Sequence, residues 1–176
     1  MPKAAQTRPF DVVVALRLTA PAGTIAALAE ELAAAPSQVH AALRRLDYAG
    51  LLKPEQRATN TRALLEFLLG GLRYAFPVQR GSIREGIPTA YSTAPLNSLV
   101  DAIDVVVWPA PAATPGLVRG FSITPLHARA SRLVTLSPRS YRLLAIVDAL
   151  RLGDPRIRPH ARAALEAELS VAGASA

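Results

Sequence analysis

The sequence predicts an α+β fold that is mainly helical, and three observations lead to that prediction. Apolar residues recur at helical spacing across most of residues 10–74 and again across 137–171. Only two short runs, 105–109 and 117–123, have the β-branched and aromatic composition of strands. Prolines and glycines punctuate residues 76–100, which are expected to form an ordered loop over the preceding helix.

Residues 1–60 are expected to form a first domain containing three helices, the first over residues 10–20. The second begins after Thr24, because a threonine hydroxyl can accept a hydrogen bond from a free amide of the first turn. Pro36 disfavours a helical residue before it and separates the second helix from the third. The third covers about residues 38–49, with Ser37 as its N-cap and Gly50 as its left-handed stop. Two helices joined by so tight a break form a helix-turn-helix pattern.

The third helix has two distinguishable faces. Val39, Leu43 and Leu46 lie at i, i+4 and i+7 and are expected to be buried. The opposite face carries small, hydrogen-bonding and basic side chains, which suit a DNA major groove because arginine can bond guanine through two hydrogen bonds. The candidate DNA-contacting residues are Ser37, Gln38, His40, Ala41, Arg44, Arg45 and Tyr48 on this helix and Arg57 in the connector after it. A plain three-helix domain can show the same pattern without binding DNA.

Four short motifs carry a resemblance to a known family: LAEEL at 28–32, PSQV at 36–39, ALRRL at 42–46 and AGLL at 49–52. Together they resemble the DNA-binding core of bacterial winged-helix transcriptional regulators of the MarR-like kind. The resemblance covers residues 10–52 and implies that residues 37–49 are the recognition helix of a dimeric, cytoplasmic regulator, with repression as its expected action. Residues 53–60 are short for the β-hairpin wing of such proteins, so a reduced or absent wing is expected.

Residues 61–176 are expected to form a second part that serves dimerisation or partner binding. A long helix over 62–74 is apolar around most of its circumference, so it is either enclosed within the chain or buried in a homodimer interface. The two strand-like runs are expected to form a small β-hairpin in which Trp108 is an anchor. Two C-terminal helices follow, the first starting at Ser137 and Pro138 and ending at Gly153.

The composition of the chain favours some classes of function and excludes others. The formal net charge of +7 favours a polyanionic partner such as double-stranded DNA, and the absence of cysteine excludes disulfides and cysteine-metal sites. Neither a nucleotide-binding fingerprint nor a catalytic motif is present, the three histidines are far apart in the sequence, and no apolar run is long enough for a membrane span. We therefore expect a sequence-specific DNA-binding regulator without enzyme activity, metal or cofactor. The alternative is a winged-helix protein-interaction or antitoxin-like module that docks a partner protein.

Overall fold

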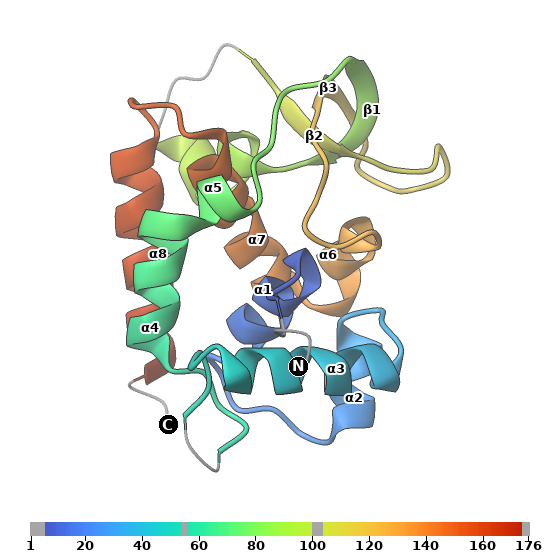
Figure 1. Cartoon of the computed structure of the whole chain (residues 1–176). Helices are drawn as coiled ribbons and strands as arrows, with labels where there is room; N and C mark the ends of the chain where they lie inside the picture. The colour runs from blue at the N-terminus through green and yellow to red at the C-terminus, as the bar shows by residue number, and fades with distance from the viewer. Residues whose placement is uncertain (1–5, 54–55, 100–103, 174–176) are drawn as a thin grey trace.

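The computed structural model describes residues 6–53, 56–99 and 104–173. Its helices are α1 (Pro9–Arg17), α2 (Ile25–Glu31), α3 (Pro36–Tyr48), α4 (Thr61–Glu66), a π-helical segment η1 (Phe67–Gly71), α5 (Leu72–Ala75), α6 (Leu133–Leu136), α7 (Pro138–Leu152) and α8 (Arg158–Gly173). Its strands are β1 (Ile83–Pro88), β2 (Val106–Pro109) and β3 (Val118–Ser122). Figure 1 shows α2 and α3 at one end of the molecule, the strands at the other end, and α1 and α7 between them.

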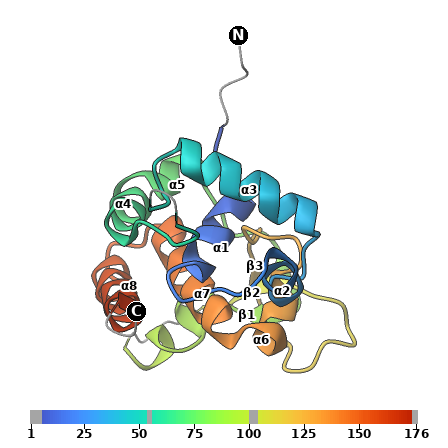
Figure 2. The same ribbon diagram turned by 90° about the horizontal axis from the view of Figure 1, so that it is seen from below.

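Helix α1 is buried on all sides. The five residues Val12 to Leu16 are each at most 1% exposed. Figure 2 shows α1 and α7 inside a ring formed by the other helices. One hydrophobic cluster contains residues from both sides of residue 60, the boundary expected between two domains. The two expected parts therefore share one core.

The α2–α3 pair follows the sequence expectation with one change at the start of α3. Thr24 caps α2, because its hydroxyl accepts a hydrogen bond from the Ala27 amide at 3.1 Å. Ser37 does not cap α3. Instead the helix begins at Pro36, a position where a missing amide hydrogen costs nothing, and Ala35 is the N-cap residue. Gly50 adopts the expected left-handed conformation, with φ of +70°, after the end of α3.

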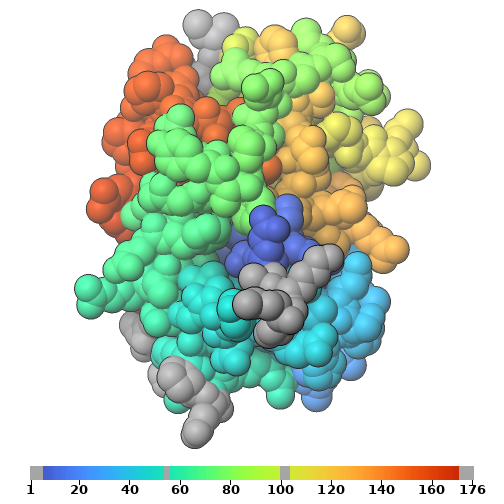
Figure 3. Space-filling model, in the orientation of Figure 1, coloured from blue at the N-terminus to red at the C-terminus, as the bar shows by residue number. Residues whose placement is uncertain are grey.

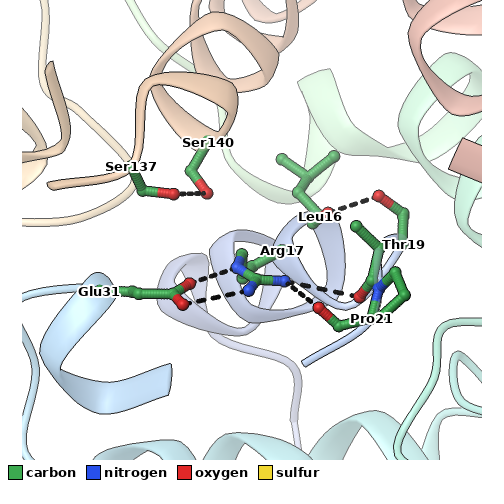
Figure 4. A network of polar contacts seen from close by, with 8 residues as sticks. Leu16, Arg17, Thr19, Pro21, Glu31, Ser137 and Ser140 are labelled. Atoms are coloured by element: carbon green, nitrogen blue, oxygen red, sulfur yellow. Dashed lines mark hydrogen bonds and ion pairs between the residues drawn. The ribbon is translucent and has the colours of Figure 1, made fainter. Parts of the chain in front are cut away.

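A polar network ties α1 to α2. Arg17, at the end of α1, forms a two-pronged ion pair with Glu31 in α2 and also donates to the carbonyl oxygen of Pro21 at 3.0 Å. Figure 4 shows the Arg17 guanidinium lying between the Glu31 carboxylate and the chain that leaves α1. The pair is mostly shielded on the Arg17 side, whose side chain is 14% exposed. It fixes the position of α2 against α1.

The expected long apolar helix is wrong. Residues 61–75 are divided into α4, the π-helical segment and α5. The apolar residues of this stretch are all buried or half-buried against the common core: Leu64, Leu65, Phe67, Leu68, Leu69 and Leu72. The chain itself therefore encloses the apolar circumference, and no second copy is needed to cover it.

The expected β-hairpin is also wrong. Strands β2 and β3 lie where the sequence placed strands, but they pair in parallel, with Val106 opposite Phe121. A third strand, β1, forms inside the segment expected to be a loop and pairs antiparallel with both, so the three strands close on themselves. Gly86 and Gly120 permit this closure. A Cβ on Gly86 would lie 2.2 Å from the Trp108 carbonyl oxygen, and one on Gly120 would lie 2.5 Å from that of Val105.

The sheet is fixed to α7 through a buried carboxylate. Asp148 is 1% exposed and accepts hydrogen bonds from Trp108 Nε1 at 2.6 Å, Thr89 Oγ1 at 3.1 Å and Arg151 Nη1 at 2.6 Å. Burial raises the pKa of Asp148, while Arg151 and the two other donors lower it. Trp108 is thus the sheet anchor that the sequence suggested, and its partner is a charged residue 40 positions away.

Candidate nucleic-acid interface

The outer face of α3 is open to solvent. Of the seven candidates on this helix, Ser37, Gln38, His40, Arg44 and Tyr48 are exposed, while Ala41 and Arg45 are half-buried. Tyr48 is 73% exposed, which is unusual for a large aromatic side chain. On the inner face, Val39, Ala42 and Leu46 are fully buried. Helical spacing therefore predicted the burial of Val39 and Leu46 correctly, whereas Leu43, which it also placed in the core, is only half-buried. Figure 3 shows α3 on the molecular surface.

Arg45 has a different role from the one expected. Its Nε donates to Asp11 Oδ2 at 2.7 Å and its Nη2 to Asp11 Oδ1 at 2.6 Å. Asp11 is fully buried in α1, and this carboxylate raises the pKa of Arg45. Because both of these nitrogens face Asp11, Arg45 braces α3 against α1, and Arg44 is the arginine of this helix that points outward.

Gln38 also has a structural contact. Its side-chain oxygen accepts a hydrogen bond from the Ala35 amide at 3.0 Å, at the start of α3. The side-chain NH₂ group is not used in that bond. Gln38 can therefore stabilise the first turn of α3 and still offer a donor to a ligand in front of the helix.

The connector after α3 folds into a small antiparallel loop. Leu52 pairs with Thr59 in a β-bridge, and the Lys53 amide donates to the Ala58 carbonyl oxygen at 2.9 Å. The Thr59 hydroxyl donates to the Ala15 carbonyl oxygen at 2.6 Å, which fixes the base of this loop to α1. We call the described residues of this connector, 52–53 and 56–59, the hairpin loop. The sequence suggested a connector with a reduced or absent wing, and the structure forms a very short hairpin there.

The hairpin loop and α3 form one continuous basic surface. A shallow open hollow lies between them and is lined by Leu43, Arg44, Asp47, Leu52, Lys53, Gln56 and Arg57. Arg57 is exposed, and its Nη1 donates to the Gly23 carbonyl oxygen at 2.9 Å, which ties the loop to the chain before α2. Among the described residues that line the hollow, Arg44, Lys53 and Arg57 are cations and Asp47 is the carboxylate. The structure thus places the expected candidate Arg57 beside Arg44.

Two residues outside the candidate set hold the turn before α3. His127 Nε2 lies 2.8 Å from the Leu32 carbonyl oxygen, so this nitrogen must carry the hydrogen, and Arg129 Nη1 donates to the Ala33 carbonyl oxygen at 3.1 Å. The His127 ring packs against Phe10 with a centroid separation of 4.9 Å. Burial lowers the pKa of His127, and the neighbouring Arg129 lowers it further. No local sequence pattern reveals these contacts, because they join positions about 95 residues apart.

Arg80, in the glycine-rich stretch, donates to Asp104 at 2.8 Å and to the Tyr91 hydroxyl. Within the described ranges, no group of three His, Asp or Glu side chains could hold a metal ion. The helices in the same ranges lack the combination of length and apolar content that crossing a membrane requires.

Comparison with protein-family models, with curated proteins and with solved structures finds no match. Function is therefore inferred from this chain's own residues.

Proposed function

We propose that the protein is a sequence-specific DNA-binding transcriptional regulator that inserts α3 into the major groove. The observation that carries the proposal is the outer face of α3, where Ser37, His40, Arg44 and Tyr48 are exposed. The opposite face of the helix packs into the core through Val39, Ala42 and Leu46. A helix at the end of a rigid body, with its polar side chains free, can approach base edges without unfolding anything else.

Each exposed side chain has a role that its chemistry allows. Arg44 can donate two hydrogen bonds to guanine O6 and N7, and Asp47 beside it can accept from cytosine N4. Ser37 and Gln38, at the start of α3, can contact a base or a phosphate, and Tyr48 can pack on the sugar-phosphate backbone. Lys53 and Arg57 of the hairpin loop are assigned to phosphates, the role that a reduced wing would have. Arg45 is excluded from this set because Asp11 holds it.

A homodimer remains part of the proposal, because one recognition helix reads only a few base pairs and two half-sites make a longer target. The segment 61–75 offers a smaller interface than the sequence suggested, since Leu64, Leu68 and Leu72 are buried within the chain. Sedimentation velocity at micromolar concentration measures the oligomeric state directly. A monomer under those conditions, with or without the selected DNA, would exclude the dimer.

The test of DNA binding is selection of bound sites from a random duplex library, followed by titration of the selected site. Arg44→Ala is expected to weaken binding by about 1–3 kcal/mol, roughly 5- to 150-fold in Kd, and to relax the preference at one base pair. The control is Arg156→Ala, which removes an exposed arginine from the α7–α8 connection at the other end of the molecule.

Salt dependence separates DNA binding from protein docking. Log Kd is expected to rise by about 0.9 per log unit of salt for each phosphate contacted, and Lys53→Ala should reduce that slope by about 0.9. If selection enriches no sequence and duplex binding shows no salt dependence, the DNA-binding proposal fails. The exposed α3 face would then belong to the alternative, a module that docks a partner protein.

A further inference from the structure

A second basic hollow lies away from α3, where the π-helical segment and α5 meet the connection from α7 to α8. It is lined by Leu69, Arg73, Gly153, Pro155, Arg158, Pro159 and Arg162. Figure 1 shows α5 crossing beside the upper end of α8, far from the outer face of α3. We call these seven residues the arginine hollow.

Three guanidinium groups from two separate stretches of chain line the arginine hollow, and no carboxylate is among the described residues that line it. Arg73 comes from α5, while Arg158 and Arg162 lie one turn apart on α8. Arg162 pairs with Glu166 at 2.9 Å, and this pair is solvent-exposed. Asp154, in the same connection, is bound by Arg156 at 3.2 Å. The hollow therefore keeps an excess of positive charge.

The guanidinium groups of Arg158 and Arg73 are held in place by the backbone around them. Arg158 Nη2 donates to the carbonyl oxygen of Leu69, inside the π-helical segment, at 3.1 Å. The Arg73 guanidinium packs on Gly153, where an added Cβ would lie 3.1–3.3 Å from its atoms. Gly153 also has φ of +70°, so glycine is favoured there on two grounds. Arginines fixed before a ligand arrives lose less side-chain freedom on binding it.

The lining selects a chemical class of ligand. A guanidinium fork matches the oxygens of phosphate, and several arginines together favour a doubly charged phosphate over a single carboxylate. The side chains of Leu69, Pro155 and Pro159 are apolar and can contact an organic group attached to that phosphate. The wide turn of a π-helix is, in addition, frequently found at functional sites.

We propose that the arginine hollow binds the phosphate end of a small organic phosphate, such as a nucleotide. Arg73, Arg158 and Arg162 bind the phosphate oxygens, and the two prolines and Leu69 contact the organic part. This site is independent of the proposed DNA interface, because it shares no residue with α3 or the hairpin loop.

In the experiment, the full chain is titrated with pyrophosphate, ADP, AMP and adenosine, and calorimetry measures the binding of each. Pyrophosphate and ADP are expected to bind with Kd below about 1 mM, whereas adenosine, which lacks phosphate, is not. Arg73→Gln and Arg162→Gln should each weaken ADP binding roughly 10-fold or more, because each removes a charge-assisted contact. Arg119→Gln, an exposed arginine on β3, is the matched control and should leave Kd unchanged.

Arg162→Gln keeps the test valid if Arg73→Gln disturbs the fold, since the Arg162 side chain is 63% exposed. Absence of saturable binding at about 10 mM pyrophosphate and ADP, or equal affinities in wild type and both variants, would overturn the proposal. A random DNA duplex forms the second arm. In one outcome, the duplex displaces ADP, and Arg73→Gln and Arg162→Gln weaken duplex binding as much as they weaken ADP binding. In that case the phosphate comes from the DNA backbone, and the small-molecule ligand is rejected. Arg44→Ala should leave ADP binding intact, whatever it does to DNA binding.

Discussion

Asp11 and Arg45 join α1 to α3 through a two-pronged ion pair in which the carboxylate is fully buried and the arginine side chain is 16% exposed. Asp11 Oδ2 also accepts a hydrogen bond from the Arg8 amide at 2.8 Å, at the start of α1. One carboxylate thus satisfies the first turn of α1 and fixes the orientation of α3. The exposed face of α3 depends on this contact.

Arg45→Ala is expected to destabilise the protein by roughly 3–5 kcal/mol, because it leaves the Asp11 carboxylate buried without its cation. Arg44→Ala, the neighbouring arginine on the exposed face, should change stability by no more than about 0.5 kcal/mol. Urea denaturation of both variants measures the difference. Equal stabilities of the two variants would show that the Arg45–Asp11 ion pair does not stabilise the fold. A double substitution of Arg44 and Arg45 is therefore unsuitable as a test of DNA contacts, because it also removes this ion pair.

Leu46→Ala tests the orientation of α3 from its other side. Leu46 is fully buried, and removing a buried leucine side chain typically costs about 2–5 kcal/mol. Tyr48→Ala is the control, since Tyr48 is 73% exposed and its loss should change stability by no more than about 0.5 kcal/mol. Thermal unfolding that ranks the two variants in the opposite order would mean that the helix faces are reversed.

The helix ends and faces that the sequence predicted correctly depend on local signals. Thr24, Gly50 and Gly153 mark helix ends through their own conformational preferences, and the spacing of Val39 and Leu46 defines the inner face of α3. The exact start of α3 was not predictable, because Pro36 and Ser37 both favour the start of a helix. In the structure, the helix begins at the proline.

The features that the sequence missed all depend on distant contacts. Arg45 looks like any surface arginine until Asp11, 34 residues earlier, is placed beside it. The parallel pairing of β2 and β3 depends on β1, whose glycine-rich sequence is typical of a loop, and on the close approach that Gly86 allows. The two cations of the hairpin loop join Arg44 only after residues 52 and 59 pair.

Ala33, in the turn between α2 and α3, adopts a left-handed conformation with φ of +50°. This conformation costs an L-residue with a side chain about 1–2 kcal/mol, whereas glycine adopts it freely but loses about 0.5–1 kcal/mol of chain entropy. Ala33→Gly is therefore expected to leave stability within about 0.5 kcal/mol of wild type or raise it. Ala29→Gly, inside α2, should instead cost about 1 kcal/mol. Equal losses in urea denaturation would refute the strain assigned to Ala33.

His127 gives the fold a pH dependence with a defined sign. Burial and Arg129 lower the pKa of His127 in the folded protein. The unfolded chain, with an ordinary histidine pKa of about 6.5, therefore binds the proton first as pH falls. The stability that neutral His127 contributes is therefore complete above about pH 6.5 and is lost as pH falls through the lowered folded value.

The matched variant is His127→Gln, because glutamine can donate to the Leu32 carbonyl oxygen without titrating. Urea denaturation at several pH values from about 8 to about 5 should show wild type losing more stability than the variant as pH falls. Comparing the two chains removes the contribution of the other titrating groups, which both share. Parallel curves would show that His127 does not titrate differently on folding.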